Sequence, residues 1–152
     1  MFIIRKTFKV PIGHRLSKHQ GLCKNIHGHN LKIEVQVSSP TLNQNDMVMD
    51  FSDLKEMVKT YIERLDHCAL LNINDKENVQ YIHNCDYKVQ LFPGDPTAEA
   101  LARYLYQELS DKFEKLPQRI QLDYVHVWEN ENSMAGYHGE RSVEIRTSRR
   151  FK

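Results

Sequence analysis

The sequence predicts an α+β fold, with a four-stranded antiparallel sheet that carries two helices on one face. Strand-like alternation occurs near both ends of the chain, and two stretches between them show helical spacing. The expected order is therefore strand, strand, helix, helix, strand, strand, which is typical of a sheet with helices segregated to one side.

The first two strands form the N-terminal part of this sheet. Residues Phe2–Val10 alternate apolar and polar side chains, as expected of a half-buried strand. Residues His27–Val37 show the clearest alternation in the chain, and Ser38-Ser39-Pro40 ends it. The polar residues 15–26 between these strands are expected to form a loop.

Two helices follow. Apolar residues recur at helical spacing within Ser52–Leu65, with Ser52 or Asp50 as the N-cap. Pro96-Thr97 opens the second helix, whose apolar stripe runs from Ala98 to Leu109. The intervening residues 72–95 are long for a loop in a compact domain.

A short strand is expected inside that insertion, at Tyr87–Phe92. The last two strands of the main sheet are predicted at Ile120–Trp128 and at Tyr137–Arg146. Neither an internal repeat nor a low-complexity segment interrupts the pattern, so residues 1–152 are expected to form a single domain.

Composition excludes several classes of function. The 152 residues are 40% hydrophobic and 27% charged, as in a globular protein. The net charge of +1 gives no excess of basic residues of the kind that binds nucleic acid. No apolar stretch is long enough to cross a bilayer, so no membrane partner is expected. Three cysteines without a disulfide pattern indicate a cytoplasmic protein.

Three histidines predict a metal site. His27 and His29 are two residues apart in a strand, so they share the face of Leu31, which is expected to lie under the helices. Burying two unpaired imidazoles there is costly, and a zinc ion removes that cost. His14, at the end of the preceding strand, comes back beside them in a hairpin. Three ligands leave one zinc position open, which is typical of a catalytic site, although His-x-His alone is a weak signal.

The segment from His14 to His29, HRLSKHQGLCKNIHGH, resembles the 6-pyruvoyl-tetrahydropterin synthase family, which includes the bacterial 6-carboxytetrahydropterin synthases. Further blocks match in order: Met47–Phe51, Leu65–His67, Pro96–Glu99 and Val127–Glu129. The resemblance implies the tunnelling fold. In that fold, three subunits close a barrel, two barrels stack into a homo-hexamer (a dimer of trimers), and active sites lie at subunit interfaces.

The resemblance also implies a role for each matched residue. His14, His27 and His29 are expected to bind zinc, Cys23 to remove a proton from the substrate, and Asp66 with His67 to act as an acid–base pair. Glu129 matches the residue that anchors the pterin ring, and Thr97 and Glu99 match a second pterin-contacting block. Without the resemblance, Cys23 would be a free loop cysteine, Asp66-His67 a helix end, Glu129 a strand end and Thr97 only a helix N-cap.

The implied function is that of a zinc-dependent lyase. It would convert 7,8-dihydroneopterin triphosphate into 6-carboxy-5,6,7,8-tetrahydropterin, losing triphosphate and acetaldehyde, in the queuosine (deazapurine) pathway. The alternatives are a 6-pyruvoyl-tetrahydropterin synthase that releases triphosphate only, a non-catalytic pterin-binding homologue, and a structural zinc module. The triphosphate is expected to contact basic side chains among Arg15, Lys18, His19 and Lys24, with no choice among them.

Overall fold

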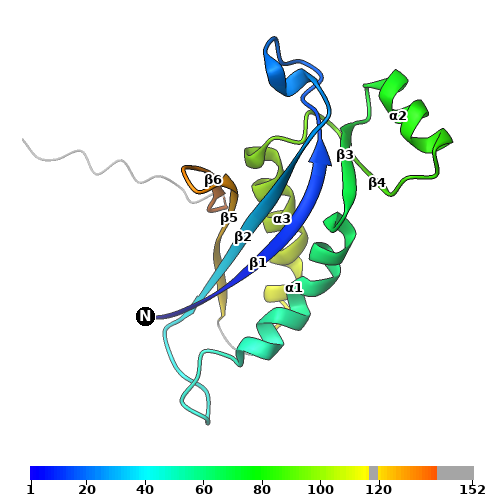
Figure 1. Ribbon diagram of the computed structural model, residues 1–152. Coiled ribbons are helices and arrows are strands. Elements are labelled where there is room, and N and C mark those ends of the chain that lie inside the picture. The colour runs from blue at the N-terminus through cyan, green and yellow to red at the C-terminus, as the bar shows by residue number, and fades with distance from the viewer. Residues whose placement is uncertain (117–119, 140–152) are drawn as a thin grey trace, which may run out of the picture.

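The computed structural model describes residues 1–116 and 120–139 of the chain. Its strands form one sheet, in the order β4-β3-β1-β2-β5-β6, and helices α1 and α3 lie along one face of it (Figure 1). The elements in chain order are β1 (Phe2–His14), the 3₁₀ helix η1 (Leu22–Lys24), β2 (His27–Ser39), α1 (Phe51–Leu65), β3 (Cys68–Asn72), α2 (Lys76–Asn84), β4 (Val89–Phe92), α3 (Ala98–Phe113), β5 (Gln121–Asn130) and β6 (Ser133–Tyr137).

The long antiparallel pair β1–β2 forms the centre of the sheet. It is paired from Phe2 opposite Ser39 to His14 opposite His27, so the loop between the strands begins and ends on a histidine. Strand β5 pairs antiparallel with β2, and β6 with β5. These four strands form the antiparallel sheet that the alternation predicted, and the expected strands over 2–10, 27–37 and 120–128 are confirmed.

The core lies between this sheet and the two long helices. Alternate residues of β2, such as Leu31 and Ile33, are fully buried, and they face the apolar stripes of α1 and α3, including Leu54 and Leu101. Each such side chain contributes about 1.5–3 kcal/mol when fully buried. Asp50 is the N-cap of α1 and accepts a hydrogen bond from the backbone N–H of Ser52, which resolves the choice between these two residues.

The sheet is larger than predicted, with six strands instead of four, and it is mixed instead of purely antiparallel. Strand β3 pairs parallel with β1, and β4 pairs parallel with β3. Strand β3 is a five-residue, mostly apolar run, Cys68-Ala-Leu-Leu-Asn72, with no alternation. Because a buried parallel strand lacks the period of two, alternation does not detect it.

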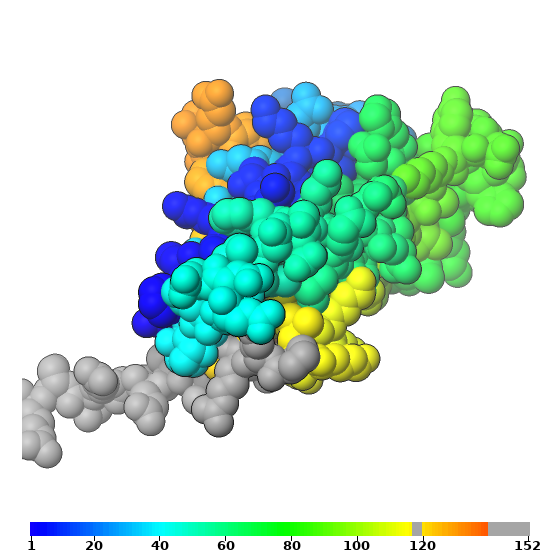
Figure 2. Space-filling model, turned by 90° about the horizontal axis from the view of Figure 1, so that it is seen from below, coloured from blue at the N-terminus to red at the C-terminus, as the bar shows by residue number. Residues whose placement is uncertain are grey.

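The insertion at residues 72–95 contains the helix α2, which the sequence pattern did not predict, and the strand β4, which was expected within Tyr87–Phe92. Figure 2 shows this segment at one end of the molecule, and its Lys88 ammonium donates to the Glu63 carbonyl near the C-terminal end of α1. Helix α2 is only nine residues long and has one buried residue, Ile82, so its apolar stripe is too short to stand out.

The last predicted strand, Tyr137–Arg146, begins too late. The observed β6 spans Ser133–Tyr137, so the prediction starts where this strand ends. Two factors misled the prediction: Gly136 breaks the alternation, and the turn before β6 is short. Positions 140–146 of that prediction lie outside the described residues. Within the described part of the chain, no helix is long and apolar enough to span a membrane.

Candidate metal centre and active site

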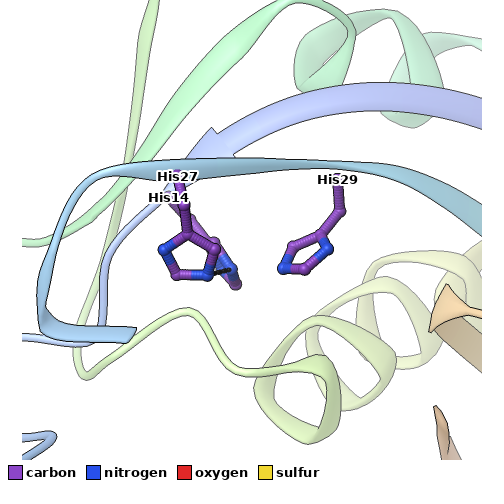
Figure 3. A group of neighbouring side chains, drawn as sticks. All are labelled: His14, His27 and His29. Atoms are coloured by element: carbon purple, nitrogen blue, oxygen red, sulfur yellow. Dashed lines mark hydrogen bonds between the residues drawn. The ribbon is translucent and has the colours of Figure 1, made fainter. Parts of the chain in front are cut away.

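Three imidazoles converge where β1 ends and β2 begins. His14 lies opposite His27, and Ile12 lies opposite His29, so pairing of the two strands brings the three rings together. One ring nitrogen from each lies within 4.8 Å of the others, and no further group of three or more metal-ligating side chains occurs among the described residues. Figure 3 shows the rings on one side of the strands, with the loop that leads into α3 running beside them.

Two of the rings are oriented by backbone carbonyls. The Nδ1 of His14 lies 2.9 Å from the carbonyl oxygen of Pro96, and the Nδ1 of His27 lies 2.8 Å from that of Asn25. A carbonyl oxygen only accepts, so each Nδ1 carries the proton and each Nε2 presents a lone pair. Metal-ligating histidines are typically oriented through their other nitrogen in this way.

The spacing of the inner nitrogens fits a metal ion. The Nε2 atoms of His14 and His27 are 3.1 Å apart, and with both Nδ1 atoms protonated no hydrogen remains to bond them. Two ligand nitrogens at about 2.0–2.1 Å from a tetrahedral zinc lie about 3.4 Å apart. The residues present therefore fit zinc, and a cation between them relieves the repulsion of the two lone pairs.

Burial keeps the central histidine in its ligand form. His14 is 1% exposed. This burial lowers the pKa of His14, and the neighbouring His27 lowers it further, while the Pro96 carbonyl and Glu129 act in the opposite direction. The net lowering favours the neutral imidazole, which is the form that binds a metal.

The glycine between His27 and His29 is required by strand packing. A Cβ added at Gly28 would lie 2.9 Å from the backbone oxygen of Ile12 on β1, which is closer than real side chains approach. A side chain here would therefore push β2 away from β1 at the level of the triad. This contact explains the small residue in the His-Gly-His motif.

Glu129 lies beside the triad. It comes from β5, and its Oε1 is 3.9 Å from the Nε2 of His14. Its neighbour Trp128 points to the other face, where Lys32 packs over the indole ring. The alternation of β5 thus directs the Glu129 carboxylate toward the predicted metal, where it can accept hydrogen bonds from a bound molecule.

Asp66 and His67 form a pair on the surface of the chain. The Nδ1 of His67 lies 3.0 Å from Oδ1 of Asp66, and the side chains of His67 and Asp66 are 79% and 48% exposed. His67 follows the last turn of α1 with φ +53°, in the left-handed region, and its backbone N–H donates to the Pro11 carbonyl. A non-glycine residue in this conformation costs about 1–2 kcal/mol. The histidine therefore lowers the stability of the fold at this position relative to glycine.

The remaining predicted residues lie in loops and at a helix start. Cys23 is half-buried in η1, within the loop that joins His14 to His27. Thr97 is the N-cap of α3 and its side-chain oxygen accepts from the N–H of Ala100 at 3.2 Å, so it has the simpler structural role that the sequence left open. Glu99 is exposed in the first turn of α3.

The structure also contains a polar clamp that sequence reasoning missed. The carboxylate of Asp95 accepts hydrogen bonds from the Ser17 hydroxyl at 2.6 Å, the Lys18 N–H at 2.9 Å and the Asn72 amide at 2.9 Å. This clamp ties the loop after His14 to the residue that precedes Pro96. Its sequence signal was an aspartate directly before the Pro-Thr-Ala-Glu block.

A second link engages one of the four basic candidates for the triphosphate. Arg15 Nη1 lies 3.1 Å from Asp75 Oδ2, and both side chains are largely buried. Lys18, His19 and Lys24 are exposed in the same loop. The insertion therefore holds Arg15 and leaves the other three side chains open to a ligand.

Comparison with known proteins gives the site a family context. Residues 3–140 match the family model described as 6-pyruvoyl tetrahydropterin synthase. The chain is 34% identical to the 6-carboxy-5,6,7,8-tetrahydropterin synthase of Aquifex aeolicus, over 90% of this chain and 98% of that protein. It is 31% identical to the protein of the same name from Haemophilus influenzae, over 90% of this chain and 99% of that protein.

Solved structures share the fold. An uncharacterized protein from Wolinella succinogenes matches with a TM-score of 0.79 at 22% identity, over 91% of this chain and 98% of that one. The 6-pyruvoyl tetrahydropterin synthase of Caenorhabditis elegans matches with a TM-score of 0.68 at 20% identity, over 91% and 95%. These likenesses confirm the tunnelling fold of the single subunit, here with a six-stranded mixed sheet and three α-helices among the described residues.

Proposed function

This chain belongs to the 6-pyruvoyl tetrahydropterin synthase family, and from that premise we propose that it is a zinc-dependent lyase acting on 7,8-dihydroneopterin triphosphate. Its products are 6-carboxy-5,6,7,8-tetrahydropterin, acetaldehyde and triphosphate. The observation that carries the proposal is the convergence of three histidine nitrogens, two of them oriented by carbonyl groups. The relatives from Aquifex aeolicus and Haemophilus influenzae, both named 6-carboxy-5,6,7,8-tetrahydropterin synthase, support the carboxy product.

His14, His27 and His29 would hold the metal through their inner nitrogens, leaving one coordination position for the substrate. When bound, zinc supplies Lewis-acid chemistry, by which the substrate hydroxyls and the adjacent C–H bonds become more acidic. A purely structural zinc module would have a fourth protein ligand. Glu129 Oε1 lies 3.9 Å from His14 Nε2, but Glu129 is not among the side chains that converge as a possible metal-binding group, which supports a role toward the substrate.

Glu129 anchors the pterin. The 2-amino group and N3 of the ring present two adjacent N–H donors, and one carboxylate accepts from both. With Glu129 beside His14, a pterin ring held by this carboxylate would lie next to the three histidines. Thr97 and Glu99, at the start of α3, form the second pterin contact, with Thr97 also capping the helix.

Cys23 and the Asp66–His67 pair move the protons. The Cys23 thiolate removes a proton from the side chain of the substrate, while His67 exchanges protons with the hydroxyls of that side chain. Asp66 accepts from the Nδ1–H of His67, which leaves Nε2 for that exchange. A free thiol must persist for this chemistry, so we place the protein in the reducing cytoplasm.

The exposure of Asp66 and His67 supports a site completed by assembly. A general acid–base that is 79% exposed in the single chain works poorly unless another surface encloses it with the substrate. The homo-hexamer implied by the resemblance, a dimer of trimers, provides such a surface. Exposed Lys18, His19 and Lys24 then surround the triphosphate, which leaves by elimination as its C–O bond breaks. Water then adds to the side-chain carbonyl carbon next to the ring, and the carbon–carbon bond beyond that carbon breaks. The carbon that took up water becomes the carboxyl group, and the remaining two-carbon fragment takes a proton and leaves as acetaldehyde.

The test is a product assay. Zinc-loaded protein is incubated with 7,8-dihydroneopterin triphosphate, the pterin is identified by mass, and acetaldehyde is measured separately. We expect 6-carboxy-5,6,7,8-tetrahydropterin and acetaldehyde in equal amounts, abolished by a chelator and restored by zinc. A pyruvoyl product without acetaldehyde would assign the alternative synthase activity, and tight substrate binding without turnover would assign a non-catalytic pterin-binding protein.

A further inference from the structure

A second pair of histidines lies on the opposite face of the sheet from the triad. His126 comes from β5, and His138 follows the end of β6. Their Nε2 atoms are 3.4 Å apart. His126 alternates with the buried Val125 and Val127, so it projects from the face that α1 and α3 leave uncovered.

We propose that His126 and His138 bind a second divalent metal ion, zinc or copper, through their Nε2 atoms. The proposal does not depend on the lyase activity, because the two sites are on opposite faces. A hydrogen bond from a ring N–H is weak beyond a separation of about 3.2 Å, whereas two nitrogens bound to one tetrahedral metal lie about 3.4 Å apart. The observed 3.4 Å therefore fits a shared metal better than a hydrogen bond.

The ring of His126 is fixed in place by its neighbours. Tyr124 stacks on it with 3.7 Å between ring centroids and 11° between the planes. From the paired strand, a Cβ at Gly136 would lie 2.5 Å from the ring carbon Cδ2 of His126, so a larger residue at position 136 would force the ring to move. A ligand held this way loses little conformational entropy when it binds a metal.

A carboxylate lies behind the first ligand. Glu34 Oε1 is 3.8 Å from the Nδ1 of His126, and the Tyr124 hydroxyl donates to the same Oε1 at 2.9 Å. At 3.8 Å this contact is longer than a hydrogen bond. A shift of the ring toward Glu34 on metal binding would give the carboxylate–histidine arrangement that orients metal ligands. Burial lowers the pKa of His126 and the proximity of His138 lowers it further, while Glu34 acts in the opposite direction.

The charges around the pair set the character of the site. Arg5 Nη1 lies 3.7 Å from Glu34 Oε1 and offsets its charge, so Glu34 orients His126 and is not itself a ligand. With two imidazoles and water as ligands, the site would exchange its ion readily. It would prefer zinc or copper over magnesium or calcium. One ligand is on β5 and the other directly follows β6, so the bound ion would crosslink β5 to the end of β6.

The experiment is a zinc titration followed by equilibrium dialysis and metal analysis. We expect two zinc ions per chain in the unmodified protein and one in His126→Ala and in His138→Ala, with the melting temperature of the zinc-free variants showing that they fold. Double replacement of His27 and His29 by alanine should remove the first ion and leave the second. Glu34→Gln should weaken the second site about tenfold or more.

His83→Ala is the matched control, because His83 is an exposed histidine on α2. It should leave both zinc ions in place. A single zinc per chain in the unmodified protein would overturn the proposal. So would a second zinc that persists in His138→Ala, or one that is lost equally in His83→Ala.

Discussion

Replacing Asp95 tests whether the polar clamp supports both the fold and the metal centre. The Asp95 carboxylate accepts from Ser17, Lys18 and Asn72 at 2.6–2.9 Å. A hydrogen bond to a charged group contributes about 1.5–3 kcal/mol, and contributions within one network are not additive. With the carboxylate half-buried, we expect Asp95→Ala to lower the free energy of unfolding by about 2–4 kcal/mol.

Asp95→Asn is the sharper variant, because it keeps the size of the side chain. The asparagine amide would point a donor at the Ser17 hydroxyl or at the Lys18 N–H, so at least one hydrogen bond is lost. We expect a loss of about 1–3 kcal/mol. Asn74→Ala, which removes only a neighbouring exposed side chain, is the control and should change stability by less than about 0.5 kcal/mol.

The pH dependence gives the clamp a signature. Burial by itself raises the pKa of Asp95, but the hydrogen bonds from Ser17, Lys18 and Asn72 outweigh it, and the pKa is lowered from its ordinary value. A carboxyl with a lowered folded-state pKa stabilises the fold above its unfolded pKa of about 3.9, and this stabilisation is lost as the pH falls through the folded value. The stability gap between the unmodified protein and Asp95→Asn should therefore be constant at neutral pH and should narrow below about pH 4.

The clamp also has a consequence for metal binding. Asp95 directly precedes Pro96, whose carbonyl accepts from the Nδ1–H of His14. Loss of such an outer contact weakens metal binding about 10–100-fold. Urea unfolding of the zinc-free protein from acid to neutral pH, with a zinc competition assay at neutral pH, measures both effects. Unchanged stability, or a stability gap that does not depend on pH, would refute the reasoning.

Further predictions concern the proposed reaction. Cys23→Ala should bind zinc normally and lose at least about 100-fold in kcat, with Cys85→Ala unchanged; full turnover in Cys23→Ala would remove the thiol from the mechanism. Glu129→Gln should lower kcat/KM by about 10–100-fold because one carboxylate acceptor becomes a donor, whereas Glu131→Gln, in the turn, should not. His67→Gly should raise the free energy of unfolding by about 1 kcal/mol, since glycine suits a positive φ, while abolishing turnover; calorimetry showing no gain relative to His67→Ala would contradict the strain argument.

Much of the fold could be predicted because β1, β2 and β5 each bury one face and therefore alternate. Strand β3 escaped detection because consecutive residues, Leu70 and Leu71, are both buried, and its apolar run, Cys68–Leu71, is too short to show a distinctive period. Helix α2 escaped because only Ile82 is buried along it. The short elements are thus defined mainly by tertiary contacts, which a local pattern does not encode.

The candidate site, like the fold, could be predicted only in part. The histidine triad could be predicted because strand periodicity and hairpin pairing determine which side chains meet. The supporting groups could not: the carbonyls of Pro96 and Asn25 that orient the rings belong to the backbone, and every residue has one. Asp95 reaches Ser17 across 78 positions of sequence. Its position directly before the Pro-Thr-Ala-Glu block draws attention to it, but a single sequence does not say which distant residues it contacts.

Two departures from local preference lie beside the proposed chemistry. His67 adopts a left-handed conformation that glycine would adopt at lower cost. His14 is fully buried with its Nε2 facing that of His27, an arrangement that is repulsive between neutral rings of this tautomer. A sequence selected for stability alone would replace both features, since each costs free energy and neither fills the core. Both features lie at this end of the sheet and not in the well-patterned core around Leu31 and Leu101, which supports placing the proposed catalysis here.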